Sequence, residues 1–238
     1  MNTAFRAASA AHPGIAVLAR AALVAALAVS VTGCGLLGGG GGGRERATIY
    51  APDVRVAPDP SWPRVDWQLA IGSAAASRVT DSPRINVRPT PSELEVYAGA
   101  AWAQPATDML EDTLLRAFED SGRIDAVARS ESGIRSDYKL VLDLRRFESD
   151  YAGAAVPSAT IEVAAKLLYN RDQRVAASRT FLQAVPAGGT DVGAVVAAFE
   201  RGLAALTADM VGWTLSSGNA DAAGTAAVPA SRRAPPAN

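Results

Sequence analysis

Apolar and polar residues alternate along several short segments of the chain. The alternation is clearest in residues 65–71, 84–88 and 93–98, and Pro89 and Pro91 separate the second segment from the third. A period of two places every second side chain on one face of a strand, so each segment predicts a strand with one buried face. In the third segment the side chains expected on that buried face are Leu94, Val96 and Ala98.

The strand pattern returns in the second half of the chain. Residues 124–128 form a short apolar candidate, and longer alternating segments follow at 138–145, 161–169 and 175–185. Residues 170–174 predict a turn, so the last two strands should form a long hairpin.

Two segments have helical periodicity instead. Pro105 suits the first turn of a helix, and the apolar positions after it share one face until Ser121 and Gly122 end the segment. The second helix should begin near Thr190 or Asp191, either of which can cap it. Such a helix usually packs on a core, although it also suits partner binding. Its apolar residues at helical spacing are Val192, Val195, Val196, Phe199, Leu203, Leu206, Met210 and Trp213.

The order of these elements is three strands, a helix, several strands and a second helix. Strands and helices alternate too sparsely for a doubly wound parallel sheet. We therefore predict an α+β fold, a mostly antiparallel sheet with two amphipathic helices packed on one face. The folded part should span residues 48–215. The Ala/Pro-rich residues 216–238 lack aromatic side chains and should form a disordered tail.

The first 33 residues predict a lipoprotein signal peptide. They carry arginines but no acids, and the apolar run at residues 21–31 is too short to span about 30 Å of hydrocarbon as a helix. The run ends in the sequence Val31, Thr32, Gly33, Cys34, which resembles the bacterial lipobox. The resemblance implies cleavage before Cys34 and acylation of this cysteine, and several acyl chains anchor a protein stably.

Residues 34–47 follow the cleavage point and contain an unbroken run of glycines, so they predict a flexible tether between the lipidated cysteine and the domain. The residue after Cys34 is Gly35 rather than an aspartate. By resemblance to lipoprotein sorting in enteric bacteria, this choice favours the outer membrane.

The composition narrows the function classes. The 23 Lys+Arg against 24 Asp+Glu give a net charge of -1, without the basic excess of a nucleic-acid-binding protein. The single His, His12, and the single Cys, Cys34, both precede the predicted domain. That domain therefore has no means for Ser-His-Asp or Cys-His catalysis, for His- or Cys-ligated zinc, or for internal disulfides. Glycine and ligand spacings typical of a P-loop or EF-hand are also absent, so we expect no metal and no cofactor.

Acidic residues remain as the only catalytic candidates. Asp108, Glu111 and Asp112 lie in the first turns of the predicted helix, where they could pair, hold a cation, or simply complement the helix dipole. The dipole explanation is the simpler one, and we predict that the protein is not an enzyme. The acids at 81 and at 148–150 fall in segments that predict loops.

Four arginines form a candidate phosphate-facing surface, since a guanidinium matches the geometry of a phosphate. The alternative is a solvated outer strand face. The four residues are Arg84, Arg88, Arg145 and Arg146.

The passage from the third strand into the first helix contains Trp102 and Pro105. Trp102 could pack under the helix or project as an anchor for a partner. Together with the strands around Pro83–Ile85 and Leu94–Val96, and with the lipobox and the closing helix, this Trp-x-x-Pro turn resembles the ABC-type transport auxiliary lipoproteins, the PqiC-like components. Gln104 departs from that pattern, which has an acid before the proline.

The resemblance implies a non-enzymatic part of a lipid-transport machine. Such a lipoprotein works with a permease, an ATPase and an MCE-domain protein that bridges the periplasm. It would dock the far end of that bridge at the outer membrane, as a single copy or as a ring of identical copies.

Two other functions fit the same sequence. A lipoprotein that regulates peptidoglycan synthesis or envelope assembly would share the lipobox, the linker and a small α+β domain. A periplasmic enzyme that uses carboxylates would need the acids of the first helix.

Overall fold

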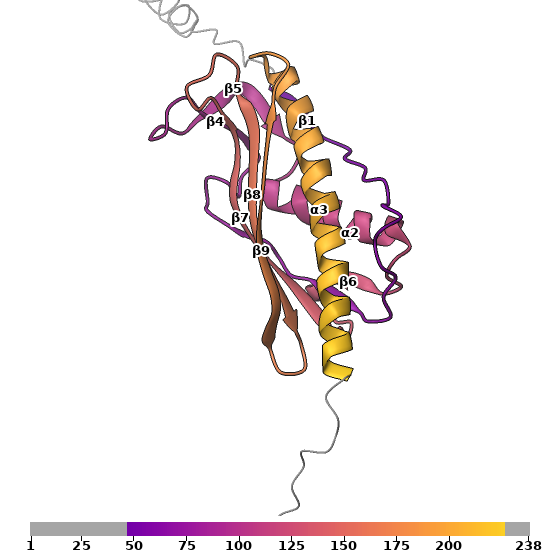
Figure 1. Ribbon diagram of the computed structural model, residues 1–238. Helices are drawn as coiled ribbons and strands as arrows, with labels where there is room; N and C mark the ends of the chain where they lie inside the picture. Colours follow the sequence, from indigo (N-terminus) through magenta and orange to yellow (C-terminus); the bar gives the residue numbers. More distant parts are fainter. Residues whose placement is uncertain (1–46, 227–238) are drawn as a thin grey trace, which may run out of the picture. The chain divides into compact units, whose positions relative to one another are not determined.

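The computed structural model describes residues 47–226 (Figure 1). The signal peptide, the lipobox, Cys34 and the predicted tether up to residue 46 lie outside the described residues, as do residues 227–238 of the predicted tail. The elements in chain order are β1 (Thr48–Tyr50), β2 (Leu69–Ile71), β3 (Ala75–Ala76), β4 (Arg84–Arg88), β5 (Glu95–Trp102), α2 (Ala106–Ser121), β6 (Val127–Arg129), the 3-10 helix η1 (Ser130–Ser132), β7 (Tyr138–Asp150), β8 (Ser158–Tyr169), β9 (Arg174–Pro186) and α3 (Val192–Ala226).

All nine strands of residues 47–226 join one sheet, which is organised around the long strand β7. On one side β7 pairs antiparallel with β8 along its whole length, and β8 pairs antiparallel with β9, which confirms the predicted hairpin. On the other side β7 is met in turn by β2, β3 and β4, all parallel to it. The 13 residues of β7 offer enough length for three short strands to pair with it successively.

The sheet is therefore mixed, which corrects the expectation of a mostly antiparallel one. The connection through α2 returns the chain so that β7 runs in the same direction as the short strands that precede it. Crossover connections of this kind produce parallel pairs, whereas tight turns produce antiparallel ones. The α+β class itself is confirmed.

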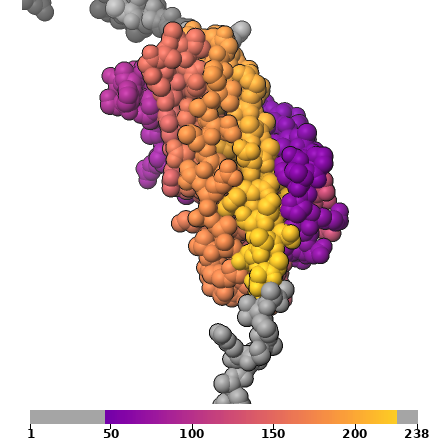
Figure 2. All heavy atoms as spheres, viewed as in Figure 1, coloured from indigo at the N-terminus to yellow at the C-terminus, as the bar shows by residue number. Residues whose placement is uncertain are grey.

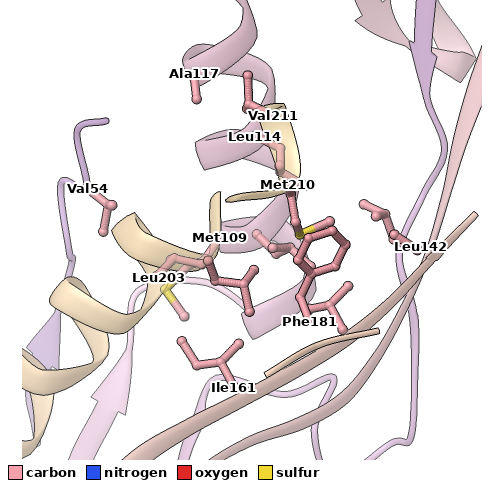
Figure 3. Packing of buried hydrophobic residues seen from close by; sticks show 14 of the residues in the cluster. Val54, Met109, Leu114, Ala117, Leu142, Ile161, Phe181, Leu203, Met210 and Val211 are labelled. Atoms are coloured by element: carbon pink, nitrogen blue, oxygen red, sulfur yellow. The ribbon is translucent and has the colours of Figure 1, made fainter. Parts of the chain in front are cut away.

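The two helices pack together on the sheet and enclose the core (Figure 1). α3 lies against β8 and β9 and also contacts α2. Figure 3 shows residues of both helices meeting sheet residues such as Leu142, Ile161 and Phe181. The apolar stripe predicted for the second helix is mainly a core stripe, because Val195, Phe199 and Met210 are almost fully buried.

The helix α3 continues well past the predicted domain end at Leu215. It reaches Ala226, so residues 216–226 are helical and the predicted disordered tail does not begin at Ser216. The added turns have partners in the sheet. The Tyr138 hydroxyl donates to Asp221 at 2.8 Å, and Arg174 donates to the same carboxylate at 2.5 and 2.8 Å. Within residues 47–226 no helix is both long and apolar enough to cross a bilayer.

Candidate functional site

The junction between β5 and α2 is built around a buried tryptophan. Trp102 is only 2% exposed, and its ring packs edge-to-face against Phe147 and Phe199, with centroids 5.9 and 5.3 Å away. Its backbone N–H donates to the carbonyl of Pro83 at 2.7 Å. Of the two roles considered for Trp102, the geometry is that of core packing, because no face of the ring is left for a partner.

Pro105 directly precedes α2, which agrees with the expectation that the fixed φ of proline suits the start of a helix. Its φ of -54° is compatible with the start of a helix, and its carbonyl accepts the N–H of Met109 at 3.1 Å. Gln104, the residue that departs from the family pattern, donates to Asp112 at 3.0 Å. The turn therefore fixes where α2 begins relative to the buried Trp102.

Two of the three candidate acids of α2 hold neighbouring segments together. Glu111 accepts the N–H of Ala74 at 2.6 Å and a hydrogen bond from Arg129 at 2.7 Å. Arg129 also donates to Asp112. Burial raises the pKa of Glu111, while the Ala74 N–H and the Arg129 guanidinium act in the opposite direction. These contacts tie α2 to the β2–β3 connection and to β6.

The third acid, Asp108, lies in the first turn of α2, where a negative charge complements the helix dipole. Within the described part of the chain, no three His, Cys, Asp or Glu side chains are grouped closely enough to hold a metal ion.

Three of the four candidate phosphate-facing arginines are engaged by carboxylates. Arg88 binds Glu148 with two hydrogen bonds of 2.9 Å, and Arg146 binds the same Glu148 at 2.7 Å. Glu148 is only 4% exposed; burial raises its pKa, and the two guanidinium groups outweigh burial and hold the pKa below its usual value. Arg145 pairs with Asp143 at 3.2 Å and with Glu162 at 3.5 Å.

These pairs depend on a segment that the sequence pattern did not assign to a strand. Residues 148–150 were expected in a loop, but β7 continues through Asp150. The alternation of 138–145 is interrupted by a bulge between Leu144 and Arg146, and polar residues follow it. The strand continues because β4 and β8 pair with it there, which no local pattern indicates.

Arg84, the fourth arginine, forms no ion pair with this network and lines a cleft of about 500 Å³. The cleft lies between the connection from β3 to β4 and the β4–β5 hairpin, and we call it the hairpin cleft. Within residues 47–226 the guanidinium groups of Arg84 and Arg78 form no salt bridge and no hydrogen bond, and only the backbone N–H of Arg84 donates, to the Ser82 hydroxyl at 3.4 Å. The four predicted arginines therefore divide into three that pair with carboxylates and Arg84, whose guanidinium has no carboxylate partner within residues 47–226. The residues that line the hairpin cleft are Arg78, Val79, Ser82, Arg84, Asn86, Leu94, Glu95 and Val96.

Two apolar side chains of this cleft, Leu94 and Val96, were predicted to be buried, and that prediction is wrong. Leu94 and Val96 are 38% and 41% exposed, and Val79 is 51% exposed. Alternation alone does not tell which face a helix covers, and neither α2 nor α3 makes more than slight contact with β4 or β5. The sequence feature that could have indicated the hairpin cleft is the pair Arg78 and Val79, an arginine beside an apolar residue in a segment that shows no strand alternation.

The comparisons with known proteins agree with this fold. The family model described as ABC-type transport auxiliary lipoprotein component matches residues 48–211. The crystal structure of protein XCC0632 from Xanthomonas campestris is 64% identical in sequence, covers 74% of this chain and 99% of its own, and has a TM-score of 0.73.

Two further relatives are more distant. An uncharacterized protein of Bradyrhizobium diazoefficiens, bll6063, is 25% identical over 178 residues, which are 74% of this chain and 47% of that protein. The chain thus spans about half the length of this curated relative. A solved structure of another uncharacterized protein is 16% identical, with a TM-score of 0.52 over 63% of this chain and 97% of that one, and supports the fold alone.

The family match extends from β1 into α3, and thus includes the sheet, α2 and the Trp102–Pro105 junction. It is not an enzyme family. The chain belongs to the ABC-type transport auxiliary lipoprotein component family.

Proposed function

We propose that this protein is a non-enzymatic lipoprotein of an envelope lipid transporter that docks a periplasm-spanning MCE-domain protein at the outer membrane. The observation that carries the proposal is the family match over residues 48–211, which covers most of the described domain. An auxiliary component works with a transporter, and the MCE protein is the partner that the sequence resemblance implies.

The organisation of the chain supports a docking role rather than a motor role. The described residues form one domain in which Trp102 is buried and Pro105 is half-buried at the junction between sheet and helix. The candidate acids Glu111 and Asp112 are engaged with Arg129, which supports a structural use of these side chains. ATP hydrolysis and membrane passage would then belong to the partners.

The anchor in this proposal is Cys34, with the lipobox residues Val31, Thr32 and Gly33 before it. Acyl chains on Cys34 would hold the protein at the periplasmic face of the outer membrane, and residues 34–47 would connect them to β1. Stable membrane attachment needs more than one acyl chain, which a lipidated cysteine of this type supplies.

Loss of the gene tests the proposal against the alternative of a peptidoglycan regulator. We expect a deletion strain to become sensitive to detergent and to accumulate phospholipid in the outer leaflet of the outer membrane. The wild-type gene should reverse both changes. Normal lipid asymmetry together with altered incorporation of wall precursors would overturn the transport proposal and favour the regulator.

A further inference from the structure

The hairpin cleft combines two unpaired positive charges with exposed apolar side chains. Arg78 and Arg84 line it, and Glu95 is the one acidic residue among its lining residues. By contrast, Arg88 and Arg146 each lie within hydrogen-bond distance of the Glu148 carboxylate. With two guanidinium groups and one carboxylate, the lining of the cleft keeps a net positive charge, and neither arginine forms an ion pair within the described domain.

The apolar half of the cleft is unusual for this surface. Eight large apolar side chains are exposed within residues 47–226, and three of them, Val79, Leu94 and Val96, line this one cleft. Scattered exposed apolar residues need no explanation, but a concentration beside charged groups indicates a binding surface. In Figure 2 the part of the molecule formed by β4 and β5 protrudes at the upper left, clear of α3.

The segment that carries Arg78 and Val79 is held firmly in place. The side chain of Asn86 donates to the carbonyl of Val79 at 3.1 Å, and the Ser82 hydroxyl donates to the same carbonyl at 2.9 Å. Thr107, in the first turn of α2, donates to Asp81 at 2.6 Å. The cleft is thus shaped before any ligand arrives, which reduces the entropic cost of binding.

One buried polar atom at the cleft also lacks a partner. Asn86 is 3% exposed, and its side-chain oxygen accepts no hydrogen bond in the described structure. A buried acceptor of this kind normally finds a donor, and an ordered water at the base of the cleft would supply one.

We propose that the hairpin cleft binds one phospholipid molecule, with its phosphate on Arg78 and Arg84 and the start of its acyl chains on Val79, Leu94 and Val96. Guanidinium groups match phosphate oxygens in geometry and charge, and the apolar side chains match hydrocarbon. A free phosphate would leave those apolar side chains uncovered. A protein partner would need to bring both an acid and an apolar group, whereas a phospholipid joins the two in one molecule.

The place of the cleft in the chain agrees with this ligand. β1, the first strand after the predicted tether, pairs in parallel with β5, and Thr48 lies opposite Ala100. β5 also carries Glu95 and Val96 of the cleft. In chain order, the predicted membrane anchor at Cys34 is followed by β1, and β1 pairs with β5, a strand of the hairpin that forms the cleft. This inference rests on the proposed role in lipid transport and names the substrate class and its site.

Binding to the isolated full-length lipoprotein tests the proposal. The protein would be purified in a non-ionic detergent and titrated with dihexanoyl phosphatidylglycerol, and bound lipid would be counted by native mass spectrometry. We expect one lipid per chain, and about tenfold or greater weakening in the double variant Arg78→Ala/Arg84→Ala, because two charge-assisted contacts are lost. The control Arg135→Ala/Arg171→Ala removes the same charge from exposed arginines of another cleft and should bind like the wild type.

The apolar half of the proposal has its own pair of variants. Leu94→Gln/Val96→Thr should weaken lipid binding about tenfold and leave the binding of glycerol 3-phosphate unchanged, whereas Val175→Thr/Leu182→Gln, at exposed positions of β9, should change neither. All replaced side chains are exposed, and circular dichroism would verify folding.

Three results would overturn the inference. The first is equal lipid binding by Arg78→Ala/Arg84→Ala and its control. The second is equally tight binding of glycerol 3-phosphate and the lipid, which would make the site a phosphate site only. The third is a dimer of this chain that covers the cleft. None of these results bears on which proteins co-purify with the chain, so the proposed transporter role would stand or fall separately.

Discussion

At the scale of single residues, Trp102 separates a structural role from a binding role most clearly. Its ring is buried against Phe147 and Phe199, and thus joins β5, β7 and α3. An aromatic side chain in such a site contributes both buried area and edge-to-face contacts. The sequence allowed both a packing role and an anchoring role for this tryptophan, and in the fold it is a core residue.

The substitution Trp102→Ala should destabilise the protein by about 3–5 kcal/mol, because it leaves a cavity in the centre of the core. Chemical denaturation followed by circular dichroism measures this change. Trp213→Ala is the control, since Trp213 is only partly buried and packs edge-to-face on Phe181. It should cost clearly less. Unchanged stability in Trp102→Ala, with partner binding lost, would return Trp102 to the interface role.

The acid Asp221 gives the structure a defined response to pH. Hydrogen bonds from Arg174 lower its pKa below the usual value, against the opposing effect of partial burial, and the Tyr138 hydroxyl adds to the lowering. A carboxyl whose pKa is lowered by folding contributes stability above its unfolded pKa of about 3.9, and this contribution is lost as the pH falls through the folded value.

Asp221→Asn should therefore cost about 1–3 kcal/mol at pH 7, because hydrogen bonds to a charged group are lost. The difference from the wild type should remain constant between pH 6 and pH 8, and should shrink as the pH falls below about 4. Urea denaturation across that range measures it. A difference that does not depend on pH would contradict the assigned ion pair.

At the scale of elements, the end of α3 shows what local patterns miss. Residues 216–226 are rich in alanine, glycine and serine, a composition typical of a disordered tail. They form helix because the sheet supplies partners: Tyr138 and Arg174 for Asp221, and the ring of Trp67 for the backbone at Gly218. Helical stability in proteins comes mostly from such packing rather than from propensity.

Two glycines of this segment test its packing. A Cβ at Gly218 would lie 2.4 Å from the ring of Trp67, whereas a Cβ at Gly224 meets nothing within 4 Å. Gly218→Ala should thus cost about 1–3 kcal/mol through overpacking. Gly224→Ala should stabilise the helix by up to about 1 kcal/mol, since alanine favours helix. Thermal unfolding measures both. Equal effects of the two substitutions would contradict the packing of α3 on Trp67.

The hairpin of β4 and β5 shows the opposite case. Here the alternation is present in the sequence, but the face that we inferred to be buried is exposed. Alternation predicted correctly a strand at 84–88 and a second strand in the region of 93–98, where β5 begins at Glu95. It also assigned Leu94 and Val96 to a buried face, and these side chains are exposed. Alternation reports two faces, but only the tertiary structure decides which face, if either, a helix covers.

At the scale of the whole molecule, periodicity predicted both helices, the long hairpin of β8 and β9 and the α+β class. It did not predict the parallel pairs of β7 with β2, β3 and β4, since pairing between distant segments leaves no mark on local spacing. For the same reason the ion network around Glu148 was missed, because Arg88 lies 60 residues away in sequence.

The placement of the protein at a membrane depends on Cys34, which lies outside the described residues. Cys34→Ala removes the only thiol that can carry the acyl chains, so the protein should leave the membrane fraction. Separation of inner and outer membranes on a density gradient, followed by immunoblotting, measures this loss. The wild type should be found with the outer membrane. Wild type in the inner membrane, or unchanged attachment of the variant, would contradict the anchor.

Co-purification from living cells would show whether this lipoprotein works as the docking component of an MCE-type lipid transporter. A tag placed after Asn238 lies beyond the described domain, and crosslinking before extraction in mild detergent preserves weak complexes. We expect mass spectrometry to recover an MCE-domain protein together with its permease and ATPase. Recovery of a peptidoglycan synthase, with no transport protein in the eluate, would contradict the docking role.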